Sequence, residues 1–139
     1  MSDDEARDFL AAGTRTGKLA TVRPNGAPHV APIWFVLDDD GSLVFTTGEE
    51  TVKGRALRHD PRASLCVDDE SPPFAYVRVD GTVTLSDDLD EMLVWATRIA
   101  ARYMGADRAE AYGKRNAVKG ELLVRLRPTK IVALKDIAD

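Results

Sequence analysis

GKLATVRPNGAPHVAPIWFVLDDDGSLVFTTG, residues 17–48, is the stretch that decides the fold class of this chain. Apolar and polar residues alternate in its three longer runs, which is the pattern of half-buried β-strands. Two turn sequences separate these runs, and their Asn-Gly and Asp-Gly pairs tolerate the positive φ angles of tight hairpins. The stretch therefore predicts three consecutive antiparallel strands, at Gly17–Arg23, Pro28–Leu37 and Ser42–Thr47.

The remaining sequence adds helices and strands to this antiparallel core. Ser2 and the acids after it predict a short N-terminal helix that ends at Gly13. Pro32 cannot donate a ladder hydrogen bond, so its strand is expected at a sheet edge or a bulge. Gly81 suggests a bulge or bend in a later strand. The other predicted elements are helices at Thr51–Arg58, Ser86–Tyr103 and Asp107–Lys114, and strands at Arg62–Asp68, Phe74–Leu85, Glu121–Leu126 and Thr129–Leu134. This order predicts an α+β fold around an antiparallel barrel.

Composition limits the class of protein. The 139 residues suit a single domain over residues 1–139, and the net charge of −4 excludes a globally basic surface for nucleic acid but leaves a local basic patch open. One cysteine cannot form an intrachain disulfide, and His29 and His59 are too far apart in sequence to suggest a metal site. No signal sequence or membrane-spanning run is evident. We therefore expect a cytoplasmic protein with no nucleic-acid or membrane partner and no metal.

LVFTTGEETVKGRALRHDP, from Leu43 to Pro61, collects several kinds of anion-binding group. The hydroxyls of Thr46 and Thr47 precede a glycine and a helix start, and Lys53 and Arg55 follow in that helix. A helix N-terminus presents unpaired N–H groups and a partial positive charge, which favour phosphate or carboxylate. This pattern predicts the phosphate end of a flavin-type cofactor site. The same two cations also fit an ordinary solvated helix face.

The chain resembles the pyridoxamine-phosphate-oxidase-like, FMN-binding split barrels, and within them the actinobacterial branch that uses the deazaflavin coenzyme F420. The resemblance covers nearly the whole chain and depends on the serial order of strand, Asn-Gly hairpin, Phe-Thr-Thr, lysine-bearing helix and Asp-Pro-Arg-Ala. The segments that carry it are Gly17–Gly48, Thr51–Glu70, Val77–Leu85 and Leu122–Leu134. It implies a split barrel of six or seven strands and a homodimer with two cofactor sites at the subunit interface.

The resemblance also assigns roles to particular positions. Thr46 and Thr47 match the strand end that contacts the ring and the phosphate, and Thr51 and Lys53 match the phosphate-binding hydroxyl and lysine. Pro32, Ile33 and Trp34 fall on the strand whose edge faces the ring, although tryptophan serves equally in a core or an interface. With Arg55, the implied cofactor-binding set is Pro32, Ile33, Trp34, Thr46, Thr47, Thr51, Lys53 and Arg55.

One departure from the family pattern concerns the identity of the cofactor. The FMN-dependent oxidases carry a flavin-binding arginine where this chain has Ala31. That difference favours coenzyme F420 over FMN, and Arg55 is available for the acidic tail of the deazaflavin. A phosphate held by one or two cations and by hydroxyls fits charge-assisted hydrogen bonding.

The resemblance implies a reductase that transfers a hydride from reduced F420 to an electron-poor double bond. The expected substrates are small molecules: enones, quinones, lactones or tetrapyrroles. Two alternatives remain open, namely an FMN-dependent oxidoreductase on the same barrel and a non-catalytic binder of flavin, deazaflavin or haem. No residue stands out as a general acid or base, so no catalytic residue is assigned.

Overall fold

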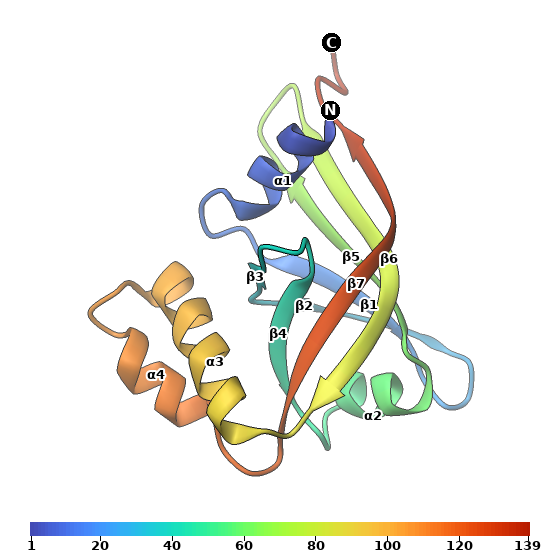
Figure 1. Cartoon of the computed structure of the whole chain (residues 1–139). Helices are drawn as coiled ribbons and strands as arrows, with labels where there is room; N and C mark the ends of the chain where they lie inside the picture. Colours follow the sequence, from blue (N-terminus) through green and yellow to red (C-terminus); the bar gives the residue numbers. More distant parts are fainter.

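The computed structural model describes residues 1–139 and contains one seven-stranded antiparallel sheet and four helices (Figure 1). The sheet curls into a half-open barrel, with α1 near one end and α3 and α4 at its side (Figure 1). This architecture confirms the predicted α+β split barrel. None of the helices is long and apolar enough to cross a membrane. The elements are α1 (Asp3–Ala11), β1 (Gly17–Val22), β2 (Pro28–Ile33), β3 (Val36–Leu37), β4 (Leu43–Gly48), α2 (Val52–His59), β5 (Arg62–Asp69), β6 (Ala75–Ser86), α3 (Leu89–Met104), α4 (Ala109–Asn116) and β7 (Glu121–Leu134).

The strand predicted over Pro28–Leu37 is broken at Trp34 and Phe35. Its first part, β2, pairs with β1, whereas its second part, β3, pairs with β4. β2 and β3 are the two ends of the sheet order β2-β1-β5-β6-β7-β4-β3, so Trp34 and Phe35 connect the two sheet edges. The prediction of one strand was wrong because local alternation cannot show that the two halves have different partners. The edge position predicted for Pro32 is confirmed, since β2 has a neighbour on one side only.

The two strands predicted at Glu121–Leu126 and Thr129–Leu134 form one strand, β7, so the predicted division between them was wrong. β7 pairs with β4 only as far as Leu126 and with β6 along most of its length. Pro128 therefore lies beyond the end of β4, where its missing N–H leaves no partner unsatisfied. The predicted irregularity at Gly81 is confirmed by a register shift between Asp80 and Gly81. A Cβ on Gly81 would collide with the carbonyl oxygen of Arg127.

β4 is buried on both faces over its first three residues, and this burial positions its polar end. Leu43 and Phe45 belong to the barrel core, whereas Val44 packs with Trp95 of α3 in a second apolar cluster. Residues that alternate along a strand face opposite sides of the sheet, so α3 covers the outer face of β4. The strand then continues through Thr46 to Gly48 and leads into α2.

Candidate cofactor-binding site

A cavity of about 360 Å³ lies where the ends of β2 and β4, the start of α2 and the helices α3 and α4 meet. Its lining residues are Thr16, Pro32, Ile33, Trp34, Thr46, Lys53, Ile99 and Asn116. Five residues of the predicted cofactor-binding set are among them, namely Pro32, Ile33, Trp34, Thr46 and Lys53. The structure therefore brings together the ring-facing strand and the predicted phosphate-binding lysine. The other three residues of that set, Thr47, Thr51 and Arg55, do not line the cavity.

The indole ring of Trp34 forms an aromatic wall of this cavity. It stacks on Tyr103 of α3 with the ring centroids 5.1 Å apart and an angle of 3° between the ring planes. The Tyr103 hydroxyl donates a hydrogen bond to the Arg15 carbonyl oxygen (2.9 Å) and accepts one from the Phe35 N–H (3.3 Å). Burial raises the pKa of Tyr103 above the ordinary tyrosine value, at which the hydroxyl is already protonated at neutral pH. Trp34 remains 40% exposed, so a firmly held ring still has surface to offer a planar ligand.

Arg102 binds the same break between β2 and β3. Its guanidinium donates to the carbonyl oxygens of Phe35 (2.7 Å), Leu10 (2.7 Å) and Gly13 (3.0 Å). Leu10 lies in the last turn of α1, where carbonyl groups lack intrahelical partners, and Gly13 follows just after the helix ends. Since Tyr103 binds the N–H of Phe35 and Arg102 its carbonyl, α3 holds the residue after Trp34 through both backbone groups.

The hydroxyls of Thr47 and Thr51 are used within the turn that starts α2. Their Oγ1 atoms lie 3.0 Å apart. Thr51 Oγ1 also donates to the Gly48 carbonyl oxygen (2.8 Å) and accepts from the Gly54 N–H (3.1 Å), which caps the helix. A Cβ on Gly54 would collide with the Gly48 carbonyl oxygen. These two threonines therefore shape the helix start, and Thr46 is the threonine of this segment that lines the cavity.

Lys53 is the free cation of the site. Arg55 pairs with Glu50 at 2.7 Å on the exposed surface, and Arg58 pairs with Glu49 at 2.9 Å. Lys53 lines the cavity without forming a salt bridge, and no acidic residue occupies the first turn of α2. The positive end of the helix dipole and the ammonium group therefore favour an anion at the same place.

Three lining residues carried no signal in the sequence that pointed to a cavity. Ile99 belongs to the apolar face of α3, and Asn116 ends α4. Thr16 lies in the connection between α1 and β1. Each reaches the cavity through contacts between elements that are distant in the chain, and no local pattern reports such contacts.

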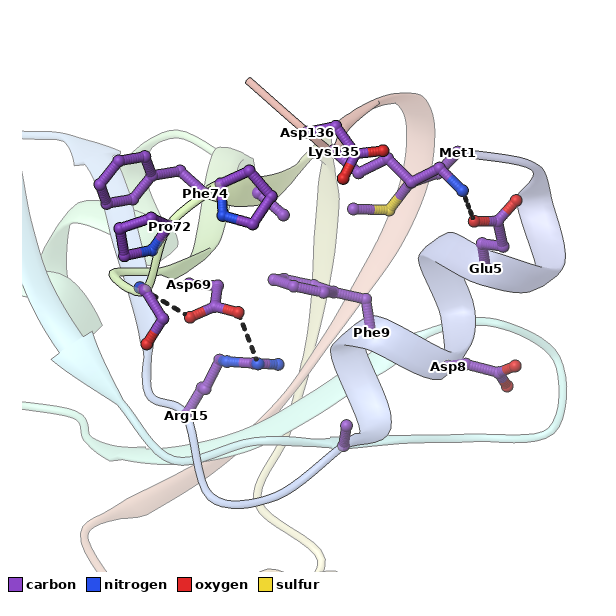
Figure 2. A pocket seen from close by; sticks show the side chains of 14 residues that line it. Met1, Glu5, Asp8, Phe9, Arg15, Asp69, Pro72, Phe74, Lys135 and Asp136 are labelled. Carbon is purple, nitrogen blue, oxygen red and sulfur yellow. Dashed lines mark hydrogen bonds and ion pairs between the residues drawn. The ribbon is translucent and has the colours of Figure 1, made fainter. Parts of the chain in front are cut away.

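A second cavity, of about 480 Å³, lies between α1, the loop before β6 and the chain after β7 (Figure 2). Phe9 and Phe74 contribute apolar walls. Its cationic side chains are engaged: Arg15 pairs with Asp69 at 3.4 Å and Lys135 binds Glu5 at 2.6 Å. This cavity offers no free lysine, and the helix start beside it, that of α1, carries the acids Asp3, Asp4 and Glu5 in its first turn. The first cavity is therefore the better candidate for a phosphate-bearing ligand.

Comparison with known proteins supports the assignment of this fold to the class of cofactor-binding split barrels. The family model for pyridoxamine 5'-phosphate oxidase matches residues 2–135. This chain belongs to that family. It is 36% identical over 88 residues to a pyridoxine/pyridoxamine 5'-phosphate oxidase of Azorhizobium caulinodans. That match covers 63% of this chain and 41% of the relative, so the chain spans about two fifths of the length of such relatives.

Two solved structures share the architecture over nearly the whole chain. A conserved hypothetical protein of Mycobacterium tuberculosis superposes with a TM-score of 0.86 at 25% identity, covering 98% of this chain and 86% of the other. A protein described as an F420 reductase superposes with a TM-score of 0.70 at 28% identity, covering 90% of this chain and 94% of the other. The fold similarity thus includes a protein described as an F420 reductase.

Proposed function

We propose that this protein is an F420-dependent reductase, and that it binds the deazaflavin in the cavity between Trp34 and Lys53. The observation that carries the proposal is one unpaired lysine at a helix start, in the same cavity as a firmly stacked indole. Such a cavity suits a flat ring at one end and a phosphate at the other. The similarity to an F420 reductase over 94% of that chain supports the proposal.

The residues of this chain bind, orient and shield the cofactor. Lys53 and the start of α2 hold the phosphodiester by charge-assisted hydrogen bonds. Trp34 and Ile33 flank the ring, and Ile99 excludes water from the cavity. Bound reduced F420 supplies the hydride for an electron-poor double bond. The cavity lining contains no carboxyl or imidazole group, so the proton that follows the hydride comes from water or from the surroundings of the cofactor.

FMN is the second candidate cofactor. It is favoured by the family match and by the relatives described as pyridoxine/pyridoxamine 5'-phosphate oxidases. Position 31 speaks against it, because Ala31 supplies no cation there. The engagement of Arg55 with Glu50 also leaves Lys53 as the free cation near the cavity. One lysine neutralises a singly charged phosphodiester, whereas a doubly charged phosphomonoester keeps one charge without a partner in the cavity.

The purified protein should bind F420 more tightly than FMN when it is titrated with each cofactor and fluorescence is recorded. With reduced F420 and a panel of enones, quinones, coumarin-like lactones and tetrapyrroles, at least one substrate should restore the absorbance of oxidised F420. Tight FMN binding without F420 binding would make the protein a flavoprotein. F420 binding without turnover of any class would favour a carrier.

We further propose that the protein is a homodimer with the cofactor at the subunit interface. A half-open barrel leaves its cofactor groove short of one wall, and a second copy supplies it. Large apolar side chains are exposed on β2 and β7, including Val30 (66%), Ile131 (47%) and Leu134 (46%). Sedimentation equilibrium should therefore give twice the mass of one chain. A monomer that still binds F420 tightly would contradict the interface model.

A further inference from the structure

Glu121 places a carboxyl group beside the turn that starts α2. It is the first residue of β7, and its strand partner is Gly48, the last residue of β4. Its Oε1 atom lies 3.8 Å from the position that a Cβ on Gly48 would occupy. Backbone hydrogen bonds hold it there, because its N–H donates to the Val118 carbonyl oxygen (3.1 Å) and the Glu49 N–H donates to the Gly120 carbonyl oxygen (2.8 Å).

Neither Glu121 nor Lys53 forms a salt bridge. The other charges of the segment form the pairs Glu49–Arg58 and Glu50–Arg55. Burial raises the pKa of Glu121, and the positive charge of Lys53 opposes that shift. The carboxyl thus lies beside the turn that leads into the helix carrying Lys53, and the two groups form no salt bridge. Glu121 does not line the cavity, so its charge would act on an anion held by Lys53 through space and not by direct contact.

We propose that Glu121 selects the charge of the bound phosphate, favouring a singly charged phosphodiester over a doubly charged phosphomonoester. This inference rests on the proposed anion site at Lys53, and it names the class of phosphate which that site accepts. Coulomb repulsion is proportional to the charge of the ligand, so its free energy is doubled for a dianion. If the charge of Glu121 weakens the binding of a monoanion by a factor of about three, it weakens the binding of a dianion by a factor of about ten.

Three ligands with one ring system separate charge from all other contacts. FMN is a phosphomonoester, riboflavin 4',5'-cyclic phosphate is a phosphodiester, and riboflavin has no phosphate. At about pH 8 the second ionisation of a phosphomonoester, with a pKa of about 6, is nearly complete. Glu121→Gln keeps the shape of the side chain and removes its charge. We expect this variant to bind FMN about tenfold and the cyclic phosphate about threefold more tightly than the unaltered protein. Riboflavin affinity should not change.

Two further variants sharpen this experiment. Glu110→Gln removes the same charge from the exposed surface of α4, where Glu110 pairs with Lys114, and should leave all three affinities unchanged. Glu121→Ala removes the charge and also shortens the side chain. It should change the ratio of FMN to cyclic-phosphate affinity by the same factor as Glu121→Gln. Agreement of the two Glu121 variants thus separates a charge effect from a packing effect.

Several outcomes would overturn the role of Glu121. They are an unchanged ratio of FMN to cyclic-phosphate affinity, an equal gain for riboflavin, and a Glu121→Gln protein that binds none of the three ligands. Failure of the unaltered protein to bind F420 is a separate result. It would refute the proposed reductase function, whereas the measured effect of Glu121 on the two flavin phosphates would still stand.

Discussion

Replacing Arg102 with methionine should lower the free energy of unfolding by about 2–4 kcal/mol. The guanidinium donates hydrogen bonds to the carbonyl oxygens of Phe35, Leu10 and Gly13. Hydrogen bonds from charged donors contribute about 1.5–3 kcal/mol each, although such contributions do not simply add. Methionine retains much of the apolar stem, so the loss reports mainly on the missing donors. The three carbonyl groups would then have to find water or remain unsatisfied.

Chemical denaturation of both proteins measures this difference, and Arg98→Met is the matched control. Arg98 lies one turn earlier in α3, is exposed, and rests over the ring of Trp95 with its guanidinium carbon 4.6 Å from the ring centroid. Its replacement should cost less than about 1 kcal/mol, the strength of an exposed cation–π contact. An equal loss of unfolding free energy in the two variants would show that the hydrogen bonds of Arg102 do not contribute measurably to stability.

Replacing Lys53 with alanine should weaken F420 binding by about 1.5–3 kcal/mol, the contribution of a charge-assisted hydrogen bond. This corresponds to about a 10- to 150-fold rise in the dissociation constant. Lys53 is the cavity cation without a salt bridge, and it lies in the first turn of α2. Fluorescence titration with F420 measures the change.

Arg55→Ala is the matched control for this lysine. Arg55 lies in the same helix, but its side chain is 65% exposed and pairs with Glu50. An exposed ion pair contributes little to stability, and Arg55 does not line the cavity. Its replacement should change F420 affinity by less than about 0.5 kcal/mol. If affinity is unchanged in Lys53→Ala, the phosphate is bound elsewhere. A large loss in Arg55→Ala would instead support its predicted contact with the acidic tail.

The Arg102 and Lys53 experiments test the two ends of the candidate cofactor cavity, namely its aromatic wall and its cation. Arg102 and Tyr103 hold the backbone of Phe35, and Trp34 next to it stacks on Tyr103. The aromatic wall of the cavity is thus attached to the same helix that covers β4, the strand leading to Lys53. Loosening of this attachment should therefore weaken the contact with a flat ring more than the contact with a phosphate.

Local patterns predicted most elements correctly because turns and caps depend on neighbouring residues. The Asn25-Gly26 turn joins β1 and β2 as expected, and Ser2 caps α1. The break at Trp34 and the continuity of β7 through Pro128 were missed. Both depend on which strands lie alongside, and alternation within a strand does not identify its neighbour.

The sequence by itself determined the antiparallel hairpins, the helix start after Gly48 and the presence of Lys53 in its first turn, since these features follow from residues a few positions apart. The tertiary structure alone decided that Glu121 lies beside Gly48 and that Lys53 lines the same cavity as Trp34. It also decided that α3 holds the connection at Trp34 and Phe35 between the two edges of the sheet. Those contacts join elements far apart in the chain, so they exist only once the sheet has curled and its two edges have been connected.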